Sequence, residues 1–168
     1  MTVDGVDFPI QEPTPFSKKW WSHKFDGAGL RYEVAVTINT GDIVAFHGPF
    51  PCGSFPDLKI FRLGIKPLLG PGEKVIADRG YRGDTRTCTP DNHLNLKHRQ
   101  AMKRARARHE TINGRLKKWQ ILKDVFRHRI LKHNYIFRCV LVIVQIEIEN
   151  GNAPFQVTNY YDPATAEF

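Results

Sequence analysis

The sequence contains few cysteines, few acidic residues and no long apolar run. Its three cysteines, Cys52, Cys88 and Cys139, are widely spaced and form no CxxC pair. An odd number of scattered cysteines argues against a disulfide framework and is typical of reduced thiols inside the cell. The longest apolar run, 139–144, is too short to cross a membrane, and residues 1–20 lack the apolar core of a signal peptide. We therefore expect an intracellular protein with no membrane segment, nuclear if its host is a eukaryote.

A zinc site is not favoured either. Cys88, His93 and His98 lie close together in the sequence and are residue types that bind zinc. A structural zinc site needs four such ligands, and no fourth candidate is evident near these three.

Acidic residues are outnumbered by basic ones, 17 against 25, which gives a net charge of +8 and a pI of about 9.6. Such an excess favours a polyanionic partner, of which nucleic acid is the commonest. A hydrophobic fraction of 41% argues against a disordered chain, and 168 residues suffice for one domain with its own core. Acidic residues that occur within basic surroundings are therefore candidates for a functional site.

The spacing of apolar residues predicts an α/β domain over residues 1–150, followed by a C-terminal tail at 151–168. Residues 11–29 are rich in Pro, Gly and Lys and are expected to form a loop. Ser54 is a candidate cap for the first helix, and Gly70 is its candidate end. We expect strands at 2–10, 31–38, 43–48, 74–78 and, briefly, 86–89, and helices at about 56–69, 97–118 and 125–149.

The order of these elements predicts how the sheet is arranged. The strand at 31–38 alternates apolar and polar residues, which predicts one buried face, and "NTGD" joins it to the next strand in a hairpin. Three antiparallel strands, a crossover helix and a further strand form an α/β layout. In this layout the strand at 74–78 can lie beside the first strand and parallel to it.

The helix at 97–118 is strongly basic, with nine Lys or Arg residues and a single acid, Glu110. One reading is a solvated charged face in which Arg106 and Glu110 form an i,i+4 pair. The other is a carboxylate that holds a metal ion while its cationic neighbours hold phosphates. The face around Glu110 collects Lys103, Arg106, Asn113, Gly114 and Lys117. The opposite, apolar face collects Ala101, Ala105, Ile112, Leu116 and Trp119.

Asp4 and Asp78 also allow two readings. Asp-Gly is a common turn dipeptide, and an Asp after a strand often caps the next segment. Taken together, however, two aspartates on neighbouring strands and one glutamate on a basic helix can supply the carboxylate oxygens that hard divalent cations require. Two such cations activate the attacking oxygen and stabilise the leaving one in phosphodiester displacement.

Four stretches of the sequence resemble the DDE transposases and endonucleases of the Harbinger type and their bacterial insertion-sequence relatives, which have an RNase H-like fold. In the bacterial relatives the last motif reads Tyr, two residues, Arg, three residues, Glu, six residues, Lys. Arg106, Glu110 and Lys117 satisfy it, and Lys103 stands where the Tyr is expected. The stretches are "VDGVDFPI", "GPFPCGSFPDLKIF", "VIADRGYRG" and "RARHETINGRLKKWQIL", in the family's order and within about 2–150.

The resemblance implies a mixed sheet flanked by helices and a catalytic triad of Asp4, Asp78 and Glu110. The triad would bind two Mg²⁺ or Mn²⁺ ions, cleave DNA with water to free a 3′-OH, and transfer that end to target DNA. Arg106 and Lys117 would clamp phosphates and orient Glu110. The further DNA contacts expected from the cationic residues near the acids are Arg79, Arg82 and Lys103.

Two other acids lie within the same motifs. Asp7 is a second candidate in the first motif, but strand alternation places Asp4 and Asp7 on opposite faces of the sheet. Asp57 corresponds to a family position that we interpret as starting a helix, and we expect a structural role for it.

The family normally carries a helical DNA-binding region before its first acid, whereas Asp4 is the fourth residue of this sequence. We therefore expect a chain without that region, as in a fragment of a transposase or a remnant reading frame. The alternative function is a catalytically inactive, domesticated or remnant nucleic-acid-binding domain. The expected partner is DNA. Two further partners are compatible with the sequence: a second copy of the chain on DNA and a separate DNA-binding protein.

Overall fold

A computed structural model describes residues 1–90 and 96–157. Short 3₁₀ helices occur at Lys18–Trp20, Lys66–Leu68 and Arg79–Tyr81. The strands are β1 (Thr2–Pro9), β2 (Trp21–Ser22), β3 (Gly27–Val36), β4 (Ile43–Pro51), β5 (Val75–Ile76) and β6 (Thr87–Cys88). The helices are α1 (Asp57–Leu63), α2 (Leu96–Lys118), α3 (Gln120–Lys123) and α4 (Ile130–Glu149).

The strands form one mixed sheet in the order β2-β3-β1-β5-β6, and β4 also pairs with β3. β1 is antiparallel to β3 along its whole length, from Thr2 opposite Val36 to Pro9 opposite Gly29. It is parallel to β5, and β5 is parallel to β6. The predicted α/β class is therefore confirmed, with an antiparallel start, a strand parallel to β1, and a layout compatible with an RNase H-like fold.

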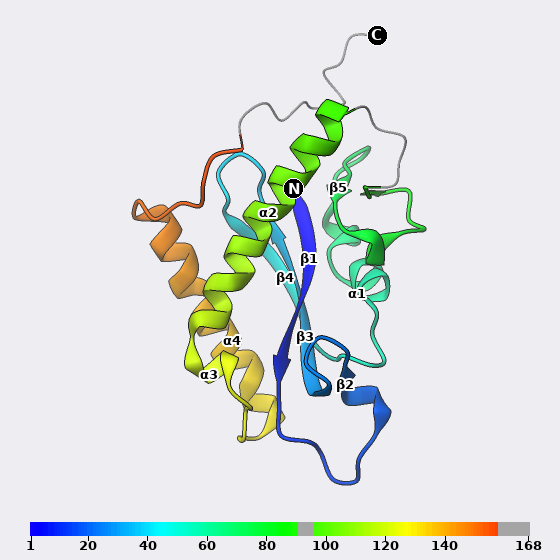
Figure 1. The fold of residues 1–168 in the computed structure, drawn as a ribbon, viewed down its shortest axis with the longest axis vertical. Helices are drawn as coiled ribbons and strands as arrows, with labels where there is room; N and C mark the ends of the chain where they lie inside the picture. Colours follow the sequence, from blue (N-terminus) through cyan, green and yellow to red (C-terminus); the bar gives the residue numbers. More distant parts are fainter. Residues whose placement is uncertain (91–95, 158–168) are drawn as a thin grey trace.

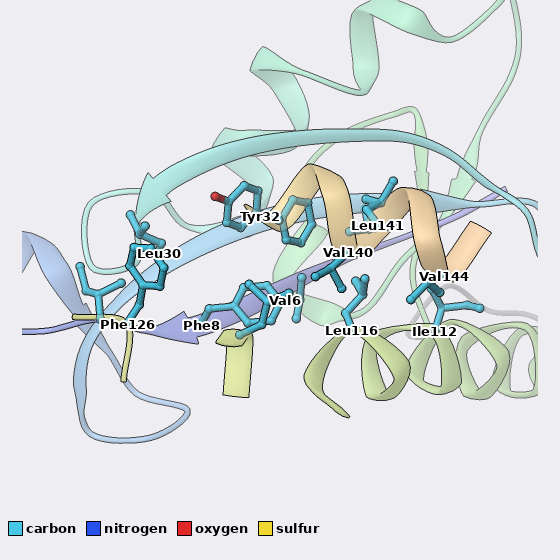
Figure 2. Close-up of a cluster of buried hydrophobic side chains, with 14 of the residues drawn as sticks. Val6, Phe8, Leu30, Tyr32, Ile112, Leu116, Phe126, Val140, Leu141 and Val144 are labelled. Carbon is cyan, nitrogen blue, oxygen red and sulfur yellow. The ribbon is translucent and has the colours of Figure 1, made fainter. Parts of the chain in front are cut away.

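Helices cover both faces of this sheet (Figure 1). On one face, side chains of β1 and β3 pack against α2, α3 and α4 (Figure 2). The rings of Tyr32 and Phe137 stack there with their centroids 3.8 Å apart. On the other face, α1 and the turn after β5 cover Val3 and Ala35 with Phe61, Ile65 and Tyr81.

The second covered face corrects the expectation that the strand at 31–38 buries one face. Glu33 and Ala35 are both fully buried, because α1 and the turn after β5 lie over them. The apolar face predicted for the basic helix is confirmed, since Ala105, Ile112 and Leu116 are buried in α2.

The first predicted helix is shorter than expected. α1 ends at Leu63, and a separate 3₁₀ turn at Lys66–Leu68 follows it. Pro67 accounts for the break, because proline has no N–H to donate to the carbonyl four residues earlier, that of Leu63, and its ring clashes with that carbonyl. The N-cap is Pro56, not Ser54.

Two other boundaries differ because backbone pairing between distant segments competes with local preferences. The last helix begins at Ile130 rather than 125, since Phe126 donates its N–H to the Pro9 carbonyl and forms a bridge with Ile10. The expected loop at 11–29 contains β2 and the first residues of β3, which pair with each other. Residues 91–95, and 158–168 of the expected tail, lie outside the described residues.

Arg108 is the largest fully buried side chain of the described residues, although it belongs to the basic helix. Its guanidinium donates to the carbonyls of Ile38, Asn39, Thr40 and Pro154. This cation therefore ties α2 to the β3–β4 turn and to the chain after α4, and does not belong to a solvated face. Within the described ranges no helix has the length and apolar character needed to span a membrane.

We expect Arg108→Ala to lower the free energy of unfolding by about 2–4 kcal/mol, because the buried Ile38 and Pro154 carbonyls and the partly buried Asn39 and Thr40 carbonyls lose a charged donor. Arg104→Ala is the matched control, since Arg104 is exposed one turn earlier and, among the residues that the structure describes, donates only to the Gln156 carbonyl at 3.3 Å. Urea unfolding monitored by circular dichroism measures both. Equal losses in the two variants would contradict the structural role of Arg108.

Candidate active site

The parallel pairing of β1 with β5 aligns Asp4 with Asp78. Thr2 stands opposite Ile76. Asp4 follows Thr2 by two residues on β1, and Asp78 follows Ile76 by two residues, just beyond the end of β5, which brings the two acids to about the same level. Asp4 lies on the α2 side of the sheet, where it bonds to Asn113 of that helix. Asp78 lines the same hollow as Asp4 and Glu110 of α2.

Asp78 lies where β5 ends and a 3₁₀ turn begins. Its Oδ1 accepts the Gly80 N–H at 2.8 Å and caps that turn. The capping role suggested by sequence is thus present, and it fixes the carboxylate beside β1. Capping and a role in a binding site are compatible, because a cap holds its side chain in one orientation.

Asp4 is half-buried and held at both oxygens. Oδ1 accepts the Gly5 N–H at 2.9 Å, and Oδ2 accepts from Nδ2 of Asn113 on α2 at 2.9 Å. Burial raises the pKa of Asp4 to about 6; Lys24 opposes this rise, and the charges of Asp78 and Asp57 add to it. The carboxylates of the site therefore repel one another.

Helix α2 contributes the third predicted acid. His109 bonds to the Thr2 hydroxyl at 2.8 Å, and Asn113 bonds to Asp4. These two contacts place the helix residues between them over the start of β1. The residues that line one small hollow at this point are Thr2, Val3, Asp4, Asp78, Arg106, His109 and Glu110. The structure thus brings all three predicted acids and Arg106 around a single depression.

The three acids do not stand at ligand distance from a common point. Among the described residues, no three His, Cys, Asp or Glu side chains converge as a metal ion requires. Glu110 is exposed and lies at the rim, whereas Asp4 is half-buried. The crowding of negative charge around Asp4 is nevertheless the environment that a divalent cation neutralises, so the donor set fits such an ion. Of the zinc candidates, His93 lies outside the described residues.

A second group of charges lies on the α1 side of the sheet. Asp7 accepts from Arg31 at 2.7 and 2.9 Å and from Ser22 at 2.6 Å, and Arg31 also pairs with Asp57 at 3.1 Å. Asp57 starts α1, as expected. Its carboxylate also occupies the space beside Gly5 that a Cβ would fill, and it borders Gly80 next to Asp78. Glycine is needed at position 5 for this close approach.

Glu33 lies fully buried on the same side, opposite Gly5 on β1 and His47 on β4. Burial raises its pKa to about 8; the neighbouring Tyr81 hydroxyl moderates the rise, and Asp57 and Asp4 add to it. Tyr81 follows Asp78 by three residues and is fully buried. Glu33 is therefore a neutral, buried carboxyl beneath the turn that carries Asp78.

The predicted DNA-contacting residues fall into two groups. Arg106 lines the hollow with the acids, exposed Lys103 lies one turn before it, and exposed Arg79 directly follows Asp78. Arg82 borders a separate hollow with Lys74 and Asp84. Lys117 lies near the other end of α2, where burial and Lys24 lower its pKa. The structure therefore gathers some, but not all, of these cations around the acids.

Sequence reasoning missed the contributions of three residues to this site, those of Asn113, Lys24 and Asp57. The helical pattern predicts that Asn113 shares a face with Glu110, but it predicts no role for Asn113. The i+3 spacing between the two residues indicates that their side chains are neighbours. Lys24 donates to the Gly5 carbonyl at 2.6 Å from a segment expected to be loop. Asp57 approaches Asp78 only because α1 folds back over β1, which no local pattern shows.

The family model described as DDE superfamily endonuclease matches residues 3–145. The chain belongs to the DDE superfamily endonucleases. This family generally uses divalent metal ions, and its matched region contains Asp4, Asp78 and Glu110.

One curated protein that is similar in sequence to this chain is named "Probable transposase for insertion sequence element IS702", from Microchaete diplosiphon. The two are 30% identical over an aligned length of 145, and the alignment covers 77% of this chain and 50% of the relative. The chain thus spans about half the length of that relative. No solved structure matches the chain.

The raised pKa of Glu33 predicts a pH-dependent effect of Glu33→Gln. As pH rises from about 4.5 to 8, the unfolded chain releases the Glu33 proton while the folded chain keeps it, so folding becomes less favourable. Glutamine has no such proton. We expect Glu33→Gln to gain stability relative to wild type between pH 5 and pH 7, by at most about 1.4 kcal/mol per pH unit. Urea unfolding across this range measures it, and a constant difference between the two proteins would contradict a neutral Glu33.

Proposed function

We propose that this domain cleaves DNA phosphodiester bonds, with two Mg²⁺ or Mn²⁺ ions held by Asp4, Asp78 and Glu110. The observation that supports the proposal is the alignment of Asp4 with Asp78 by the parallel β1–β5 pairing, with Glu110 of α2 at the rim of the same hollow. When bound, the cations activate the attacking water and stabilise the leaving oxygen.

The protein residues hold this site in shape. Asn113 and the Gly5 N–H orient Asp4, and the Gly80 N–H orients Asp78, so two of the three acids are fixed before any ligand arrives. Glu110 is exposed on a helix and reaches the hollow from outside. The arrangement supports a site in which β1 and β5 supply a rigid base and α2 supplies the third ligand.

The neighbouring cations support a DNA substrate. Arg106 lies in the hollow, and Lys103 and Arg79 lie on the adjoining surface, which suits phosphates on either side of the scissile bond. Lys117 and Arg82 are proposed to contact DNA further along its path. The name of the curated relative supports strand transfer to target DNA as the step that follows cleavage.

A catalytically silent DNA-binding domain is the second candidate. It is favoured by the separation of the three carboxylates, which in the described residues do not converge at ligand distance. Such a domain would bind DNA with a strong salt dependence and would cleave it with neither Mg²⁺ nor Mn²⁺. The two experiments below separate these functions.

Asp4→Asn should raise the stability of the metal-free protein at neutral pH by about 1–3 kcal/mol, because it removes a carboxylate whose ionisation is opposed by burial and by neighbouring acids. A rotated Asn113 amide can accept from the new side chain, since Asn113 Oδ1 is buried without a partner. Mn²⁺ should raise the melting temperature of wild type by mass action and leave that of Asp4→Asn unchanged. Equal Mn²⁺ responses would argue against Asp4 as a ligand.

Asp78→Asn should abolish Mn²⁺-dependent nicking of supercoiled DNA while the fold is retained, because asparagine can still cap the turn by accepting the Gly80 N–H. Asp124→Asn, an exposed acid at the end of α3, is the control and should cleave as wild type does. Nicking that survives in Asp78→Asn would show that this site does not perform the reaction.

A further inference from the structure

Helix α4 has an apolar outer face in addition to its buried one. Its inner side chains, among them Phe137 and Val144, pack against the sheet. On the outer side, Leu131 is 82% exposed, Tyr135 68%, Val142 53% and Ile146 50%. Cys139 is exposed in the middle of the same face. A contiguous apolar strip of this kind on a surface helix is typical of an interaction site.

The outer residues follow a coiled-coil spacing. Lys132, Tyr135, Cys139, Val142, Ile146 and Glu149 are separated by alternating intervals of three and four residues. This is the a/d pattern of a helix that pairs with another helix through a narrow seam. The seam is apolar at its four central positions and charged at its two ends. Leu131 and Ile143 flank it.

The charges of α4 are distributed against its own macrodipole. Its first half contains Lys132 and Arg138 and no acid, and its second half contains Glu147 and Glu149 and no Lys or Arg. The N-terminus of a helix favours negative charge and the C-terminus positive charge, so each end carries the unfavourable sign. An antiparallel neighbour with the same sequence corrects both, because its basic N-terminal half would lie beside Glu147 and Glu149.

We propose that α4 is a dimerisation helix, which pairs antiparallel with α4 of a second copy of this chain. In this register Lys132 of one copy meets Glu149 of the other, Tyr135 meets Ile146, and Cys139 meets Val142. The two-fold axis passes near the midpoint of the helix. Every a position then faces a d position of the partner, as antiparallel pairing requires.

The packing of its inner face against the sheet already stabilises α4 as a helix, so pairing does not include the free-energy cost of forming the helix. The seam is short, however, and one helix pair buries less than the about 1,600 Å² of a standard interface. A weak, concentration-dependent dimer is therefore expected. The proposal does not depend on DNA cleavage, because association is measured without DNA or metal ions.

Sedimentation equilibrium tests the proposal over protein concentrations of about 1–100 µM, in reducing buffer so that Cys139 forms no disulfide. Wild type should change from monomer to dimer in this range. Ile146→Glu places a charge within the seam and should weaken association at least tenfold. Leu68→Glu is the matched control, because Leu68 is 69% exposed on the 3₁₀ turn after α1, and this variant should associate as wild type does.

A charge exchange tests the antiparallel orientation. Lys132→Glu should weaken the dimer about tenfold by opposing Glu149, and adding Glu149→Lys to the same chain should restore association. In a parallel pair Lys132 would face Lys132 and Glu149 would face Glu149, so Lys132→Glu would exchange one like-charge pair for another. Association that is unchanged in Lys132→Glu would therefore overturn the proposed orientation. A wild-type chain that stays monomeric at the highest concentration, or a dimer that Leu68→Glu also disrupts, would overturn the proposal itself.

Discussion

The short parallel contact between β1 and β5 is the interaction on which the candidate site depends. β5 has only two residues, and its link to β1 includes the Ile76 N–H bonded to the Met1 carbonyl at 3.0 Å. Burial of Val75, Ile76 and Ala77 between the two helical layers holds the strand in this register. A shift by one residue would turn Asp78 to the other face of the sheet and separate it from Asp4.

The site combines two groups of charges on opposite faces of one strand. Asp4 faces α2, whereas Gly5 allows Asp57 of α1 to approach the backbone from the other side. Their proximity raises the pKa of Asp4, in addition to the effect of its burial. Arg31 offsets part of this repulsion by bonding both Asp7 and Asp57. Such a cost in stability is typical of sites whose acids serve a ligand and not the fold.

Helix α2 has three roles along one sequence that looks uniformly basic. Ile112 and Leu116 join the core, Arg108 ties distant carbonyls together, and Arg106 and Glu110 reach the hollow. Helix α4, by comparison, has little charge and two apolar faces. The domain thus separates the proposed catalytic and DNA-contacting residues of α2 from the proposed dimerisation surface on α4.

The sequence by itself determined the class of fold, the order of its elements and the family. Alternating and helical apolar spacing are local patterns, so β1, β3, α2 and most of α4 could be predicted from them. Only the tertiary structure decided the burial of Glu33 and Arg108, the approach of Asp57 to Asp78, and the role of Asn113. Each of these depends on residues far apart in the chain that meet only after α1 and α2 have packed on opposite faces of the sheet. Such packing leaves no periodic pattern in the sequence.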